Sequence, residues 1–343
     1  MSELRWHPLL EQWVITATHR QDRTYKPPAD HCPLCPSRPG GEPTEIPAGT
    51  YQIAVFENRF PSLRTPAPEP AVEATLLSPV EPARGRCEVV CYTPEHEGSL
   101  ATLDPEHAFR LVQVWTDRYQ ALMAEPEIEY VLIFENRGEA VGVTLHHPHG
   151  QIYAFPYVPP VARQELEAQA RFKGARAEGP DACLLCRQLE IERQDGRRII
   201  GENEAFTAVI PFYARYPYEV HVLPRRHVAS LVELAEDEQR ALAAILQGLV
   251  AAYDRLFGFP FPYIMVMHQA PKRPAPVRGH FHVEFLPPHR TREKLKYLAG
   301  CEQGAGSFIN DTLPEEKAAE LRRCWVERPG AGASPGRVRR GRG

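Results

Sequence analysis

The chain has 343 residues, of which 43% are hydrophobic and 24% are charged, and its formal net charge is -4. This composition is ordinary for a globular protein of one or two domains, so it excludes a disordered or fibrous chain. The charge gives nucleic acid no overall attraction, no apolar run reaches the roughly 18 residues of a membrane span, and the N-terminus does not resemble a signal peptide. We therefore expect a cytoplasmic protein without a membrane or nucleic-acid partner.

The first half of the chain alternates short strands with one long helix. Strands are predicted, in order, at residues 5–23 (a pair that ends in a basic loop), 51–56, 87–92 and 130–134. A Cys-x-x-Cys pair, Cys32 and Cys35, follows the first strand pair. A helix is predicted to begin after Asp104, because Asp is a common N-cap residue and Pro105 suits the first helical position. The half ends in His147-Pro148-His149-Gly150-Gln151.

The second half repeats this order. It begins with a second Cys-x-x-Cys pair, Cys183 and Cys186. Strands are predicted at 219–223, 263–267 and 280–286, with a helix at 235–257. Each half also has a lone histidine in the pattern His-x-x-Ser-Leu-x-x-Leu, at His96 and His227, and a His-x-His sequence 51 or 53 residues later. Such self-similarity indicates an internal duplication.

The duplication predicts the domain organisation. We expect an N-terminal half, a C-terminal half and a disordered tail rich in glycine and arginine, at residues 1–172, 173–327 and 328–343. Arginine in the tail could contact nucleic acid, but a solvated tail is the simpler interpretation.

The cysteine and histidine residues predict two metal sites. Two thiolates and two imidazoles form a closed tetrahedral zinc set, and each half supplies one. The first set is Cys32, Cys35, His96 and His147, and the second is Cys183, Cys186, His227 and His280. These residues could instead be ordinary core or surface residues, but that would have to happen twice in the same order. If the first histidine of each His-x-His binds metal, the second, His149 in the first half, is not a ligand.

The segment from Asn136 to Gln151, which ends in His-Pro-His-Gly-Gln, resembles the galactose-1-phosphate uridylyltransferases of the histidine-triad superfamily. The resemblance extends from Trp6 to about Leu321. It implies an α+β fold of duplicated histidine-triad-like halves, with mostly antiparallel half-barrel sheets and flanking helices, and a homodimer with sites near the subunit interface. It also implies transfer of UMP from UDP-glucose to galactose 1-phosphate, through a covalent uridylyl-histidine in a ping-pong mechanism.

The side chains suit this chemistry. A neutral imidazole such as His149 can attack a phosphorus atom without first losing a proton, if an acceptor holds its other nitrogen. Gln151 cannot carry a proton, as the third histidine of triad hydrolases can, but it can donate a hydrogen bond to a phosphoryl oxygen. The second half has Glu284 at the equivalent place, and a carboxylate repels a phosphoanion. We therefore expect catalysis by His149 and Gln151 in the first half only.

The resemblance also implies substrate and metal contacts. Nucleotide and phosphate contacts are expected at Arg20, Arg23, Asn58, Phe60, Asn136, Thr144 and Gln151. Sugar-phosphate contacts are expected at Lys296, Tyr297 and Glu302, although Phe308 stands where the family pattern can carry a later glutamine. An alternative second metal set, for zinc or iron, is Glu165, His268, His280 and His282. It competes with the Cys183 and Cys186 set for His280.

Two alternative functions remain open from the sequence. A related nucleotide-sugar phosphorylase or adenylyltransferase would use the same covalent histidine on another nucleotide sugar. A zinc-stabilised module that binds nucleotide or nucleic acid without catalysis would explain the two metal sets and the arginine-rich tail. The spacing typical of zinc ribbons is absent, however, and Gln151 has no purpose in such a module.

Overall fold

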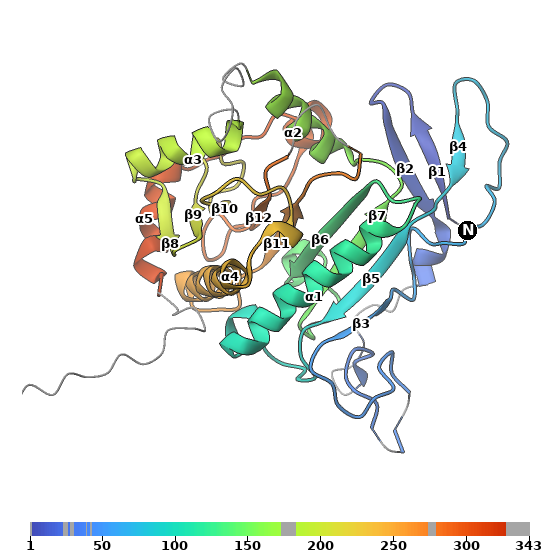
Figure 1. Ribbon diagram of the computed structural model, residues 1–343, viewed down its shortest axis with the longest axis horizontal. Coiled ribbons are helices and arrows are strands. Elements are labelled where there is room, and N and C mark those ends of the chain that lie inside the picture. Colours follow the sequence, from blue (N-terminus) through green and yellow to red (C-terminus); the bar gives the residue numbers. More distant parts are fainter. Residues whose placement is uncertain are drawn as a thin grey trace, which may run out of the picture.

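A computed structural model describes residues 2–22, 27, 31–38, 40–41, 43–172, 183–273 and 279–326. These residues form a three-stranded sheet, in the order β2-β1-β4, and a nine-stranded sheet, in the order β3-β5-β7-β6-β11-β12-β10-β9-β8 (Figure 1). Neighbouring strands in both sheets are antiparallel. Together with the flanking helices, this arrangement confirms the predicted α+β class.

The small sheet is built from the N-terminus. Its strands are β1 (Ser2–His7), β2 (Gln12–Ala17) and β4 (Val80–Pro82). Trp6 and Trp13 lie opposite each other, with ring centroids 5.2 Å apart in an edge-to-face contact. The predicted strand pair is confirmed, but the expected basic loop after it is a short 3-10 helix at Thr18–Asp22.

The large sheet joins the two halves of the chain. The first half contributes β3 (Ala54–Glu57), β5 (Arg86–Cys91), β6 (Tyr130–Arg137) and β7 (His149–Phe155). The second contributes β8 (Ile199–Glu202), β9 (Phe206–Val209), β10 (Val220–Pro224), β11 (Tyr263–His268) and β12 (His282–Leu286). The order β3-β5-β7-β6 is mirrored by β9-β10-β12-β11, and β6 pairs with β11 where the halves meet.

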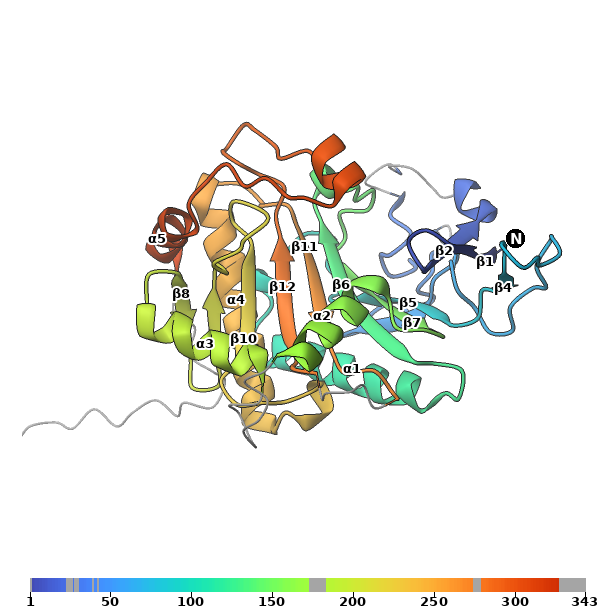
Figure 2. The same ribbon diagram turned by 90° about the horizontal axis from the view of Figure 1, so that it is seen from above.

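Helices cover the large sheet. They are α1 (Pro105–Ala124), α2 (Pro160–Arg171), α3 (Leu184–Asp195), α4 (Glu236–Phe257) and α5 (Pro314–Cys324). The equivalent helices α1 and α4 lie against one face of the sheet (Figures 1 and 2) and share one hydrophobic cluster with its strands. As predicted, α1 begins after Asp104, whose carboxylate accepts a hydrogen bond from the His107 N–H (3.0 Å).

The predicted start of the last strand is wrong, and the difference explains how the metal-site histidines are oriented. The last strand was expected from residue 280, but β12 begins at His282, just as β7 begins only at His149. The first histidine of each His-x-His therefore lies before its strand, where its ring turns toward a cysteine pair instead of following the alternation of the sheet. The predicted tail at 328–343 lies outside the described residues. Of the described helices, none has an apolar stretch long enough to span a bilayer.

Candidate functional site

His149 is the first residue of β7, which lies between β5 and β6. Its Nδ1 atom is 2.7 Å from the carbonyl oxygen of His147. A carbonyl oxygen can only accept, so Nδ1 carries a proton, and in the neutral ring the lone pair is then on Nε2. The backbone therefore selects the tautomer in which Nε2 is the nucleophilic nitrogen.

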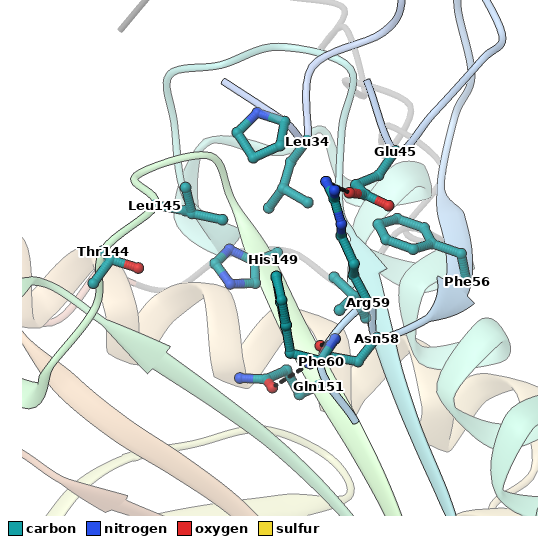
Figure 3. Close-up of a pocket in the computed structure, with 12 residues that line it drawn as sticks. Leu34, Glu45, Phe56, Asn58, Arg59, Phe60, Thr144, Leu145, His149 and Gln151 are labelled. Atoms are coloured by element: carbon teal, nitrogen blue, oxygen red, sulfur yellow. Dashed lines mark hydrogen bonds and ion pairs between the residues drawn. The ribbon is translucent and has the colours of Figure 1, made fainter. Parts of the chain in front are cut away.

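A cavity, which we call the first cavity, is lined by His149 and by residues of β3, β7 and neighbouring loops (Figure 3). Its lining is about half apolar or aromatic and half polar, and the polar groups come from β7 and from loops. Lining residues include Leu34, Phe56, Asn58, Phe60, Thr144 and Gln151. The predicted residues Asn58, Phe60, Thr144, His149 and Gln151 thus come together around one cavity. A flat apolar base could pack against its rings.

The side chains of Gln151 and Asn58 contact each other in the lining of this cavity (Figure 3). The Asn58 Nδ2 atom donates to Gln151 Oε1 over a long 3.5 Å, and Asn58 Oδ1 accepts from the Phe60 N–H (2.9 Å). Because Asn58 occupies the amide oxygen of Gln151, the amide nitrogen of Gln151 is oriented to act as a donor. An anionic ligand beside His149 would receive that hydrogen bond.

The two predicted arginine contacts are not part of the cavity lining that the structure describes. Arg20 donates from Nη1 to the Phe60 carbonyl (2.8 Å) and lies near the Tyr153 hydroxyl (3.4 Å), so here it supports the cavity wall. Arg23 lies outside the described residues. The sequence analysis missed a third arginine, Arg59, which lines the cavity and pairs with Glu45 (3.1 Å). In the sequence, its only indication is its position next to the predicted contact Asn58. Its partner Glu45 comes from a separate segment, the loop after the cysteine pair, so the ion pair could not be predicted.

His149 also lines a second cavity, of about 540 Å³. Its polar lining includes Asn136, Arg137 and Ser99, and His149 and Leu145 line both cavities. The predicted contact Asn136 therefore lines this second cavity and not the first. His149 is placed where a ligand could extend from one cavity to the other.

The first predicted metal group is assembled beside the nucleophile. One ligand atom from each of Cys32, Cys35, His96 and His147 lies within 4.8 Å of the others. The Nδ1 atoms of both histidines face Cys35 Sγ, at 3.5 and 3.6 Å. Burial and the neighbouring Cys32 raise the pKa of the Cys35 thiol to about 11, so this thiol needs a nearby cation to ionise at neutral pH. The donor set fits zinc.

His147 is prepared as a ligand by its surroundings. Its Nε2 atom donates to the Thr93 carbonyl (2.8 Å), which leaves the lone pair on Nδ1, the atom that faces the thiols. Burial lowers the pKa of His147 to about 4, so the ring is neutral at pH 7. The same residue thus offers a ring nitrogen to a metal and its carbonyl to His149.

The second predicted group is assembled in the same way. Ligand atoms of Cys183, Cys186, His227 and His280 lie within 4.8 Å of one another. His280 Nδ1 is 3.3 Å from both Cys183 Sγ and Cys186 Sγ, and His227 Nδ1 is 3.7 Å from Cys186 Sγ. Cys183 caps α3 by accepting from the Cys186 N–H. The second half therefore has the same two-thiol, two-imidazole set.

The four residues of the alternative second metal set do not lie together in the structure. His280 faces the thiols, whereas Glu165, His268 and His282 meet Glu284, with ligand atoms within 4.8 Å of one another. His268 Nδ1 lies 3.1 Å from Glu165. Although burial opposes ionisation, His221, His268, His282 and Arg215 hold the pKa of Glu284 at about 2. This oxygen- and nitrogen-rich group could also hold a metal.

The predicted sugar-phosphate residues form a separate group. Lys296, although buried, donates to Glu302 (3.0 Å), whereas 73% of the Tyr297 surface is exposed. In the described part of the chain, none of the three lines either cavity at His149. Phe308 packs against Tyr216, with ring centroids 6.0 Å apart. Within one copy of the chain, these residues do not reach His149.

Comparison with known proteins places this geometry in context. Residues 1–159 match the family model described as galactose-1-phosphate uridyl transferase, N-terminal domain, and residues 165–328 match the model of its C-terminal domain. A galactose-1-phosphate uridylyltransferase of Thermotoga maritima is 41% identical over 329 residues, which cover 95% of this chain and 100% of the relative. One of Rattus norvegicus is 31% identical, over 93% of this chain and 86% of the relative.

Solved structures give the same result. One described as the structure of uridylyltransferase has a TM-score of 0.82 and 34% sequence identity, and covers 94% of this chain and 98% of the other. An ADP-glucose phosphorylase from Arabidopsis thaliana with bound ADP-glucose has a TM-score of 0.69 over 94% of this chain and 98% of the other. Its identity of 24% shows a shared fold only.

Proposed function

This chain belongs to the galactose-1-phosphate uridylyltransferase family, and we propose that it transfers UMP from UDP-glucose to galactose 1-phosphate through a covalent bond to His149. One observation carries the proposal. The His147 carbonyl holds the proton on Nδ1 of His149, so the lone pair is on Nε2 of a ring that lines the first cavity. The enzyme is a nucleotidyltransferase of galactose metabolism.

The reaction takes two displacements. In the first, His149 Nε2 attacks the α-phosphorus of UDP-glucose, an N–P bond forms, and the P–O bond to glucose 1-phosphate breaks. The leaving group keeps the electron pair and departs as a stable phosphate anion that needs little acid catalysis. In the second, a phosphate oxygen of galactose 1-phosphate attacks the same phosphorus and the N–P bond breaks. The products are glucose 1-phosphate and UDP-galactose.

The other site residues suit these steps. We assign the uracil and ribose to the cavity with Phe60 and Asn58, and the phosphates to the side of Thr144 and Gln151. Gln151 would stabilise the negative charge that develops on the phosphoryl oxygens, which lowers the barrier of both displacements. Asn136, in the second cavity, would then contact the phosphate that leaves. Arg20 supports the wall, and Arg23 remains a proposed phosphate contact.

We propose zinc at both cysteine and histidine groups. When bound, the metal would be closed off by four protein ligands and would contribute to stability, with no position left for substrate. The first group would also fix His147 and, through its carbonyl, His149. Zinc or iron at Glu165, His268, His280 and His282 would require His280 to turn away from the two thiols that it faces, so we favour the thiolate set.

A homodimer would complete the site. Lys296, Tyr297 and Glu302 do not line the cavities at His149, yet the family resemblance assigns them to the sugar phosphate. The surrounding segment exposes Tyr297, Ile309 and Leu313, as an interface would. We therefore propose that a second copy brings this segment to the active site. The eight free thiols suit a reducing compartment, so we place the enzyme in the cytoplasm.

Paired substrates test the proposal against its alternative. We expect the protein to convert UDP-glucose with galactose 1-phosphate, and to convert ADP-glucose with inorganic phosphate at least 100-fold more slowly. The reverse preference would indicate a nucleotide-sugar phosphorylase with the same covalent histidine. Turnover of neither pair, with retained metal and nucleotide binding, would instead support a non-catalytic zinc module.

A further inference from the structure

A buried carboxylate lies on the strand next to β7, where the two halves of the chain meet. Glu135 is on β6, which pairs with β7 on one side and with β11 on the other. Only 5% of its surface is exposed. It accepts hydrogen bonds from the Tyr92 hydroxyl (3.1 Å) and from the Tyr263 hydroxyl (3.0 Å), and both tyrosines are fully buried. The UMP transfer described above uses none of these three groups.

Tyr92 contacts the chain on both sides of His149. Its backbone N–H donates to the Pro148 carbonyl (3.0 Å), one residue before His149. Its hydroxyl occupies the space beside Gly150, one residue after it, because a β-carbon built on Gly150 would collide with the hydroxyl oxygen. That β-carbon would also lie 3.2 Å from Tyr92 Cζ and from the Phe134 carbonyl. Gly150 is therefore required for this close approach.

The two hydrogen bonds of Glu135 fix the Tyr92 ring. Without them, the Tyr92 ring could rotate or move away from Gly150. Its hydroxyl is bound to the Glu135 carboxylate, which the Tyr263 hydroxyl holds in turn. A buried carboxylate needs such donors, because without them its charge would be left uncompensated away from water. The arrangement thus joins Tyr263, in the second half, to the backbone that carries His149 and Gln151. A displacement of about 1 Å of such side chains can lower a rate by about 100-fold.

We propose that Tyr92 and Glu135 are positioning residues for UMP transfer, which hold the backbone on both sides of His149 so that its Nε2 atom and the Gln151 amide meet one phosphoryl group. The inference rests on the proposed function of His149. Glu135 also lines the second cavity, but the two phenols occupy its carboxylate, so we assign neither residue a contact with substrate. Both act through the backbone of β7.

Single-turnover kinetics of the zinc-loaded enzyme test the proposal. UDP-glucose labelled in the uracil is mixed with excess protein, and the maximal rate of labelling and the half-saturating concentration are measured separately. We expect Tyr92→Phe and Glu135→Gln to lower the maximal rate at least tenfold and to change the half-saturating concentration less than twofold. The matched control is Tyr119→Phe, which removes a buried phenol that donates to the Ala270 carbonyl (3.0 Å) and should keep the wild-type rate.

A rescue separates positioning from loss of stability. Gly150→Ala inserts a methyl group where the Tyr92 hydroxyl lies, and we expect it to lower the rate at least 100-fold. Adding Tyr92→Phe removes that hydroxyl and should restore the rate at least tenfold relative to Gly150→Ala alone. Wild-type rates in Tyr92→Phe and Glu135→Gln would overturn this inference, and so would a double variant no faster than Gly150→Ala. Either result would leave the proposed function of His149 standing. If the wild-type protein is not labelled at all, the proposed function fails with it.

Discussion

The Nδ1 atom of His149 lies 2.7 Å from the carbonyl oxygen of His147, and the ring of His147 faces the thiol of Cys35. A metal at the first cysteine and histidine group would therefore hold the residue that orients the nucleophile. The second half has the same relationship, since His282 Nδ1 lies 3.0 Å from the His280 carbonyl. There, however, the ring of His282 is close to Glu284 and His268, which suits a cation and not a phosphate.

Cys32→Ser should remove metal from the first group. We expect the metal content to fall by about one per chain and the free energy of unfolding to fall by about 2 kcal/mol or more, which corresponds to several degrees in Tm. The rate of UMP transfer should fall as well, because His147 loses its anchor. Elemental analysis, thermal unfolding and the transfer assay measure the three effects. Cys324→Ser, at a cysteine of α5 outside both groups and outside the proposed active site, should change none of them.

Cys183→Ser should separate stability from activity. The variant should also lose about one metal per chain and unfold at a lower temperature, because it disrupts the second group and the cap of α3. Its single-turnover rate should stay within about threefold of wild type where the protein is folded, since the first group and His149 are intact. An unchanged metal content, or a rate as low as that of Cys32→Ser, would contradict the division of roles between the two groups.

Substitutions of Gln151 test its role as a donor to the phosphoryl group. We expect Gln151→Ala to slow the transfer by about 100-fold, the size of effect seen when one such donor is removed. Gln151→Glu, which copies Glu284 of the second half, should be slower still, because a carboxylate repels the phosphoanion. Single-turnover rates measure both. A Gln151→Glu variant that equals or exceeds Gln151→Ala would show that charge at this position does not matter.

Stability should depend on pH through Glu135. Burial raises the pKa of this carboxyl to about 7, against the combined effect of Arg137 and the two tyrosine hydrogen bonds, while Asp254 adds to the increase. Because the folded-state pKa lies above the unfolded value of 4.5, folding favours the protonated form. The contribution is fully present below pH 4.5 and is lost as the pH rises through 7. The difference between the folded and unfolded pKa values corresponds to about 3 kcal/mol in the free energy of unfolding.

Glu135→Gln supplies the measurement. The free energy of unfolding by urea is determined at pH 5 and pH 8 for wild type and variant, so that effects of metal binding common to both cancel. We expect the advantage of the wild type over the variant to decrease by about 3 kcal/mol between these pH values. Parallel pH profiles for the two proteins would show that the carboxyl does not titrate in this range.

The duplicated order of elements and the two cysteine and histidine sets could be predicted from the sequence. Paired cysteines, a lone histidine and His-x-His recur at matched intervals, and the spacing of apolar residues identifies α1 and α4. The direction of single side chains could not be predicted. His280 was a candidate for two metal sets, and only the turn of its ring toward the thiols separates them.

The remaining surprises have a similar cause. The packing of Tyr92 against Gly150 joins residues far apart in the chain, and neither has a motif that indicates the contact. Asn136 matches the family pattern, yet the alternation of β6 decides which cavity it faces. The segment with Lys296 could be recognised from the sequence, but its position relative to His149 depends on tertiary structure and, as we propose, on a second copy of the chain.

The most direct test of the covalent mechanism is to isolate the intermediate. The protein is incubated with UDP-glucose labelled in the uracil and without galactose 1-phosphate, and protein-bound label is measured after treatment with acid or base. The mechanism predicts a wild-type adduct that is stable to base, labile to acid and released as UDP-galactose on addition of galactose 1-phosphate, and no adduct in His149→Ala. An unlabelled but active wild type, or equal labelling of His149→Ala, would contradict it.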